Sequence, residues 1–131
     1  MLVLCVDWGG GLMASQTPKE LFDLGVKSIE AKDYIQAKKY FEKACDLKYG
    51  GGCSNLGVLY QNGQVVEKDL TKAAYFYSKA CELKESFGCG ALAVLYINGQ
   101  GVEKNLTKAD QYISKACKLG DQKACEALKE K

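Results

Sequence analysis

The chain has 131 residues, with 18 basic and 16 acidic side chains, a net charge of +2 and no histidine. The charges alternate without forming blocks, so neither nucleic acid nor an anionic membrane is expected as a partner. The lack of histidine excludes triads and zinc sites that need an imidazole. The length fits one compact domain, and no apolar run reaches the roughly 20 residues that cross a bilayer.

Residues 1–14 differ in character from the rest of the chain. The apolar tract Leu2–Val6 is followed by an acidic residue, a tryptophan, three glycines and Leu12-Met13-Ala14. This pattern is similar to the end of a secretory signal with a small residue at the cleavage site, although it lacks a basic start. A disordered tail or a cloning remnant are the alternatives. Cleavage after Ala14 would also remove Cys5, the one cysteine of seven outside the repeats described below.

From Thr17 the pattern becomes helical. Thr17-Pro18-Lys19-Glu20 has the composition of a capping box with proline in the first turn, and apolar and small residues then mark one helical face to about Ala31. Asp33 is expected to cap a second helix from Tyr34 to Leu47, which carries apolar residues at spacings of three and four. The two helices predict an antiparallel hairpin.

A second and a third hairpin follow. Gly50-Gly51-Gly52 is expected to end the preceding helix, and Cys53 to open the next one, which stops at Asn62-Gly63. Asp69 then caps a helix over 70–84. Residues 54–89 and 90–125 are identical at 20 of 36 aligned positions, which indicates internal duplication.

These patterns predict one domain over 15–131, with hairpins at about 17–53, 54–89 and 90–125. The charged residues 126–131 are expected to form a half-helix that caps the last apolar face. The fold class is therefore all-α, a right-handed α/α solenoid of about three hairpins. In this arrangement Asp33, Asp69 and Asn105 serve as helix caps, and the aromatic residues that recur in register pack in the core. These aromatic residues are Tyr60 with Tyr96, and Tyr40 with Phe76 and Tyr112.

The repeated unit resembles a known family. Leu56-Gly57-x-Leu59-Tyr60-x-x-Gly63, followed by Lys72-Ala73 and Tyr77-x-x-Ala80-Cys81, is similar to Sel-one-like repeats, which are related to tetratricopeptide repeats. Because two cysteines with seven residues between them recur in every unit, the chain resembles the Helicobacter cysteine-rich proteins from Thr17 to its end. Gly11–Ala14 also resembles the end of a signal peptide in that family. The resemblance implies a secreted or periplasmic protein.

Six cysteines permit 15 pairings, and the repeat selects among them. Because the units are equivalent, each should pair its two cysteines in the same way, so that a disulfide joins the end of one hairpin to the start of the next helix. Closing such a short loop contributes roughly 2 to 3 kcal/mol. Zinc and redox catalysis are the rival interpretations, but the chain lacks histidine and C-x-x-C motifs. The expected disulfides are Cys45–Cys53, Cys81–Cys89 and Cys117–Cys125.

The family is associated with penicillin binding and slow β-lactam hydrolysis, so the resemblance implies a β-lactamase as an alternative function. However, none of the serines is followed by lysine three residues later, and S-D-N and K-T-G motifs are absent. No catalytic residue is assigned, and no metal or cofactor is expected. A β-lactam or a peptidoglycan-like molecule is the ligand that this alternative implies.

A binding surface is the main functional prediction. In a solenoid the first helices of the hairpins line the concave side. Aligned residues at i, i+4 and i+7 form stripes there that can accept an extended peptide or a partner helix, from a host or a cell-envelope protein. Burial by the chain's own tail or by a neighbouring copy is the alternative. Asn62 and Asn98 precede glycines and more readily serve the helix ends, whereas Asn55 can hold a peptide backbone. The predicted groove residues are Phe22, Val26, Ile29, Ser54, Asn55, Val58, Gln61, Val94 and Ile97.

Overall fold

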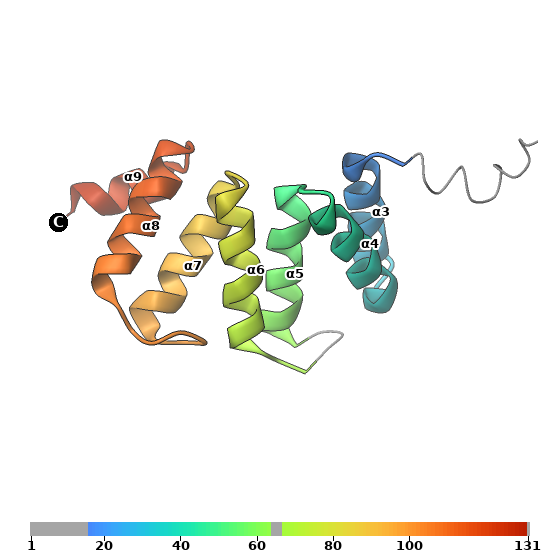
Figure 1. Ribbon diagram of the computed structural model, residues 1–131, viewed down its shortest axis with the longest axis horizontal. Coiled ribbons are helices and arrows are strands. Elements are labelled where there is room, and N and C mark those ends of the chain that lie inside the picture. Colours follow the sequence, from blue (N-terminus) through green and yellow to red (C-terminus); the bar gives the residue numbers. More distant parts are fainter. Residues whose placement is uncertain (1–15, 64–66, 131) are drawn as a thin grey trace, which may run out of the picture.

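A computed structural model describes residues 16–63 and 67–130, and over these ranges its regular secondary structure is all helix, joined by short turns and loops (Figure 1). The expected signal-like segment 1–14 lies outside them. Within the two ranges, no helix combines the length and the apolar composition needed to span a membrane. The helices are α3 (Pro18–Glu30), α4 (Tyr34–Asp46), α5 (Gly50–Asn62), α6 (Leu70–Glu82), α7 (Ser86–Asn98), α8 (Leu106–Lys118) and α9 (Gln122–Lys129).

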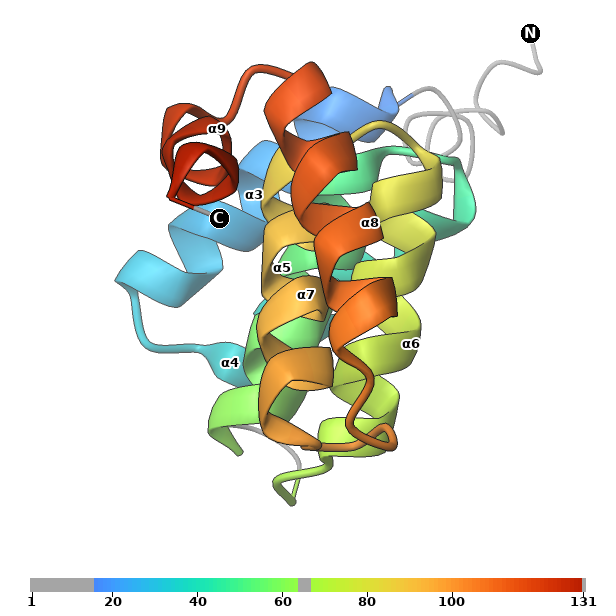
Figure 2. The same cartoon turned by 90° about the vertical axis from the view of Figure 1, so that its left-hand side faces the viewer.

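Each helix packs against the next one along the chain, and α5 also contacts α7. Figure 1 shows the resulting row of hairpins, with α3 and α9 at opposite ends. Figure 2, turned to look along this row, places α5 and α7 on one side and α6 and α8 on the other. The predicted all-α solenoid of helical hairpins is confirmed.

The helix starts follow from the predicted caps. Thr17 and Glu20 form the reciprocal capping box, with distances of 2.8 and 3.1 Å between each side-chain oxygen and the other residue's backbone nitrogen. The side chains of Asp33, Asp69 and Asn105 each accept a hydrogen bond from the backbone N–H three residues later. These bonds satisfy N–H groups that have no partner within the helix.

Within each hairpin, a small residue on the first helix faces a large residue on the second. Tyr77 of α6 is buried against Gly57 of α5, and a Cβ atom at Gly57 would lie 2.5 Å from the Tyr77 ring. The same arrangement recurs one unit earlier, where Phe41 lies against Gly25. In the third unit alanine replaces glycine as Ala93. Close approach of the two helices therefore depends on this small residue.

The recurring aromatic residues lie at the edge of the core. Tyr60 stacks on Phe76 with ring centroids 5.6 Å apart, and Tyr96 stacks on Tyr112 at 5.8 Å. Tyr60 is buried as predicted, whereas the other three rings, like that of Tyr40, are only half-buried. The fully buried aromatic side chains are those that face the glycines of the first helices.

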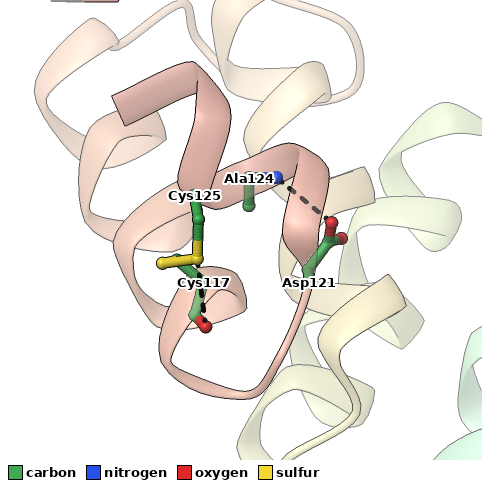
Figure 3. The surroundings of a disulfide bond; sticks show 4 residues. All are labelled: Cys117, Asp121, Ala124 and Cys125. Carbon is green, nitrogen blue, oxygen red and sulfur yellow. Dashed lines mark hydrogen bonds between the residues drawn. A yellow bond between two sulfur atoms is a disulfide. The ribbon is translucent and has the colours of Figure 1, made fainter. Parts of the chain in front are cut away.

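The three predicted disulfides are confirmed. Each joins the end of a second helix to the first turns of the next helix, with Cα–Cα distances of 4.6 to 4.7 Å. The first two pairs are almost inaccessible, with no sulfur-bearing residue more than 3% exposed, whereas the last pair is half-buried. Figure 3 shows this last bridge beside Asp121, whose carboxylate accepts a hydrogen bond from the backbone N–H of Ala124.

Two predicted boundaries were wrong. The run Gly50–Gly52 does not end a helix but forms the first turn of α5, which the disulfide Cys45–Cys53 joins to α4. This turn packs so closely on α4 that a Cβ at Gly52 would lie 2.8 Å from the Ala44 Cβ. The C-terminal cap is not a half-helix over 126–131. It is α9, which begins at Gln122, is capped by Asp121 and includes Cys125 of the third disulfide.

Candidate functional site

The first helices of the hairpins line two adjoining cavities, which together we name the groove. The N-terminal cavity has a volume of about 420 Å³ and lies between α3, α5 and the turn before α7. Aromatic rings, glycines and polar groups line it. Its lining residues are Phe22, Tyr49, Gly50, Gly51, Ser54, Asn55, Val58, Leu83, Glu85 and Phe87.

The C-terminal cavity has a volume of about 540 Å³ and lies between α7, α8 and α9. Small and aliphatic side chains dominate its lining, among them Ala91, Val94 and Ile97. Phe87, at the start of α7, lines both cavities and therefore stands between them. A third cavity of about 290 Å³ adjoins α3 and α5, and Asn55 and Val58 line it as well as the N-terminal cavity.

The groove exposes apolar side chains in a row along α7. Phe87 is 51% exposed, Val94 49% and Ile97 37%. These residues lie seven and three positions apart, so they share one side of the helix. Contact between such an apolar surface and water is unfavourable, so an exposed apolar row of this kind is typical of an interaction site.

Eight of the nine predicted groove residues line one of the three cavities, and the structure brings them together on the first helices. Val26 differs, because it packs against the core around Phe41. Ser54 is 3% exposed and lies at the floor of the N-terminal cavity rather than on its rim. The other predicted residues divide between the three cavities: Phe22, Asn55 and Val58 in the first, Gln61, Val94 and Ile97 in the second, and Ile29 in the third.

Gln61 is engaged within the protein. The Tyr77 hydroxyl donates a hydrogen bond of 2.5 Å to Gln61 Oε1, and both residues line the C-terminal cavity. Burial raises the pKa of Tyr77 to about 12, because the phenolate would lose its hydration. The phenol is therefore neutral at physiological pH and acts as a fixed hydrogen-bond donor in the wall of the groove.

Sequence reasoning did not identify several groove residues, among them Tyr49, Glu85 and Phe87. Each of these three belongs to the turn between two hairpins or to the first turn of the helix that follows, where the repeats differ most. Tyr49 aligns with Glu85, and Phe87 aligns with Gly51. The signal that could have identified them is this departure from the repeat pattern beside an invariant cysteine.

The groove contains one serine with unsatisfied hydrogen-bonding capacity. The Ser54 hydroxyl is buried and has no hydrogen-bond partner within the part of the chain that the structure describes. Over the same ranges, no group of three or more histidine, cysteine, aspartate or glutamate side chains could hold a metal ion. The described lining of the groove combines apolar side chains, aromatic rings and a few polar groups.

Comparison with known proteins identifies relatives of this repeat. The family described as Sel1 repeat matches residues 21–49, 51–85 and 86–121. HcpC of Helicobacter pylori is 71% identical over 59 residues, which is 45% of this chain and 20% of HcpC. Its name gives beta-lactamase as a provisional assignment. The chain thus spans about a fifth of the length of this curated relative.

Solved structures share the architecture. Helicobacter pylori cysteine rich protein B is 36% identical and superposes with a TM-score of 0.70, covering 86% of this chain and 98% of that one. A protective antigen of uropathogenic Escherichia coli that displays an SLR fold is 25% identical with a TM-score of 0.78. That match covers 85% of this chain and 25% of the antigen.

Proposed function

Because this chain belongs to the Sel1-repeat family, in its cysteine-rich group, we propose that it is an interaction scaffold that holds an extended peptide segment of a partner protein in the groove. The observation that carries the proposal is the exposed apolar row of α7: Val94 and Ile97 line the C-terminal cavity, and Phe87 lines both cavities. A solenoid of this kind offers a long preformed surface, so little ordering of the protein opposes binding.

The experiment uses a defined probe, a phage-displayed library of random nonapeptides, selected on the oxidised protein of 131 residues. Enriched peptides are then synthesised with a fluorescent label and titrated by anisotropy. Val94→Asp and Ile97→Asp place a charge in the groove and should weaken binding at least about tenfold, since a buried charge without a partner is costly. Leu106→Asp is the matched control, because Leu106 is 56% exposed at the start of α8.

The proposal requires that these variants remain folded, which circular dichroism and an intact disulfide count by mass spectrometry establish. If Leu106→Asp weakens binding as much as Val94→Asp does, the peptides bind elsewhere and the groove assignment is wrong. If no peptide is enriched over a serum albumin control, peptide binding itself is refuted.

We further propose that the protein acts in the periplasm or outside the cell. Three disulfides in so short a domain support an oxidising compartment, because thiols in the cytosol are kept reduced. Cell fractionation with thiol alkylation before lysis tests this directly. Six alkylated cysteines in the repeats would contradict it.

Slow β-lactam hydrolysis is a second candidate, favoured by the name of HcpC. The hydroxyl of Ser54, which is buried in the groove without a hydrogen-bond partner in the described ranges, is the group to test. Hydrolysis of a chromogenic cephalosporin in proportion to protein concentration, and its loss in Ser54→Ala, would support the candidate. A rate equal to the buffer rate would remove it.

A further inference from the structure

The N-terminal cavity owes its open shape to one glycine. Gly51 occupies the position that Phe87 holds in the next unit and Lys123 in the last. A Cβ atom at Gly51 would lie 3.1 Å from Phe22 Cε1 and 3.2 Å from Tyr49 Cε2. A larger residue would therefore press on both rings and close the space between them.

Aromatic rings form the walls of this cavity. The rings of Phe22 and Tyr49 lie against each other with centroids 5.3 Å apart, and Phe87 lines the same cavity from the start of α7. The Phe87 ring is itself fixed by an edge contact with the buried Tyr77 at 6.0 Å. The faces of aromatic rings carry negative electrostatic potential and attract cations within about 6 Å.

A carboxylate completes the cavity. Among the described residues that line it, Glu85 alone is charged. Glu85 is the residue that precedes α7, but unlike Asp121 at the equivalent position it makes no side-chain capping bond. The structure shows no ion pair or hydrogen bond of its side chain within residues 16–63 and 67–130. The carboxylate is therefore available to a ligand.

Two polar groups lie next to these rings. The buried Ser54 hydroxyl has no partner in the described ranges, and the half-buried Asn55 lines the same cavity one residue further along α5. Both can accept hydrogen bonds from a ligand N–H group. Aromatic faces, one unpaired carboxylate and additional acceptors are the combination that a basic side chain requires.

We propose that the N-terminal cavity binds an arginine side chain of the partner peptide, while a large apolar side chain of the same peptide occupies the C-terminal cavity on the other side of Phe87. This inference rests on the proposed peptide-binding function. Arginine is preferred over lysine, because a planar guanidinium stacks on aromatic rings and donates two parallel hydrogen bonds to one carboxylate. The partner is thus a peptide segment with an arginine and an aliphatic or aromatic residue close in sequence.

The test compares the random-nonapeptide selection on the wild-type protein and on Glu85→Gln. Wild-type protein should enrich peptides that contain arginine together with a large apolar residue, and Glu85→Gln should lose the arginine preference. The best arginine peptide is then titrated beside versions in which citrulline or lysine replaces the arginine. Citrulline keeps the shape but removes the charge, so it should bind at least about tenfold more weakly to the wild type.

Glu85→Gln should weaken the arginine peptide by about tenfold and leave the citrulline peptide within about twofold. Glu103→Gln is the matched control, because Glu103 is exposed in the loop between α7 and α8, at the opposite end of the helices. It should leave both peptides unchanged. Binding of the arginine peptide should also weaken as salt is raised, whereas binding of the citrulline peptide should not.

The arginine site and the peptide-binding function are refuted by different results. Peptides that bind the groove, lose affinity with Val94→Asp and show no difference between arginine and citrulline would overturn the arginine site while keeping the scaffold function. A lysine peptide that binds more tightly than the arginine peptide would overturn the guanidinium preference. If no peptide binds at all, or if the protein instead captures a second copy of itself through this face, both the site and the proposed function are refuted.

Discussion

The three disulfides have the same loop length but should differ sharply in their importance for stability. Each spans a sequence separation of 8, so loop closure alone predicts about 2.5 kcal/mol for every one of them. Their surroundings differ. Cys81 and Cys89 are at most 1% exposed and belong to a buried cluster with Ala116, whereas Cys117 and Cys125 are half-buried at the end of the chain.

We compare the double variants Cys81→Ala/Cys89→Ala and Cys117→Ala/Cys125→Ala. Removing the middle bridge loses the loop-closure contribution and the packing of two buried sulfurs, for a total of about 4 kcal/mol of unfolding free energy. Removing the last bridge frees only α9, a helix of 8 residues with none buried, which packs on α8 alone among the strongly contacting elements. The unfolding free energy of the main transition should then fall by about 1 kcal/mol or less, because few apolar contacts are lost.

Urea unfolding followed by circular dichroism measures the main transition, and hydrogen exchange read by mass spectrometry measures α9 separately. The last variant should show rapid exchange over 122–129 and a nearly unchanged transition for the rest of the chain. Limited reduction of the wild type followed by alkylation gives an independent measurement, in which Cys117 and Cys125 should be modified first. Equal losses of stability in the two variants, or reduction of the middle bridge first, would refute the view that the more deeply buried disulfide contributes more to stability.

Three further predictions concern single residues. Lys84 has a φ of 67°, whereas Gly120 occupies the equivalent turn of the next unit, so Lys84→Gly should raise the unfolding free energy by about 0.5 to 1 kcal/mol in urea titrations. A lower stability would show that the lysine is not strained there. Gly57→Ala should destabilise the protein by about 1 to 3 kcal/mol, because its Cβ would overlap the Tyr77 ring, and a neutral result in the same titration would contradict the tight packing. Burial raises the pKa of Tyr77 to about 12, so the unfolded state loses its phenolic proton at lower pH than the folded state does. The stability that Tyr77 contributes is present below about pH 10 and is lost progressively as the pH rises to about 12. The stability difference between wild type and Tyr77→Phe, which also lacks the bond to Gln61, should therefore shrink over that interval.

The sequence predicted what the repeat imposes on every unit. Helix caps at Asp33, Asp69 and Asn105 and the pairing of cysteines eight positions apart recur with the same spacing, so one solution holds for all units. Local propensity was misleading where tertiary contacts override it. A run of three glycines ordinarily ends a helix, but Gly52 is needed in α5 because no side chain fits between it and Ala44.

The groove could be predicted only in part, for a related reason. The stripes on the first helices follow from helical periodicity, and the structure places Asn55, Val58 and Val94 in cavities as their positions suggest. The aromatic cavity could not be predicted in this way. It depends on Tyr49 and Glu85, which belong to two different turns and line one cavity only in the folded chain.

The equivalence of the units also indicates where specificity can lie. The disulfides place the first turn of each first helix in the same position relative to the preceding hairpin, so a substitution there changes the chemistry of the groove without changing its frame. At this position the three units carry Gly51, Phe87 and Lys123. Gly51 leaves the N-terminal cavity open, Phe87 places an apolar ring between the two cavities, and Lys123 is a cation. Residues that agree between units therefore maintain the solenoid. Under the proposed peptide-binding function, residues that differ on the groove side would decide which peptide it holds. If this is correct, Gly51→Phe should close the N-terminal cavity and abolish the arginine preference, with no loss of affinity for the apolar side chain beyond Phe87.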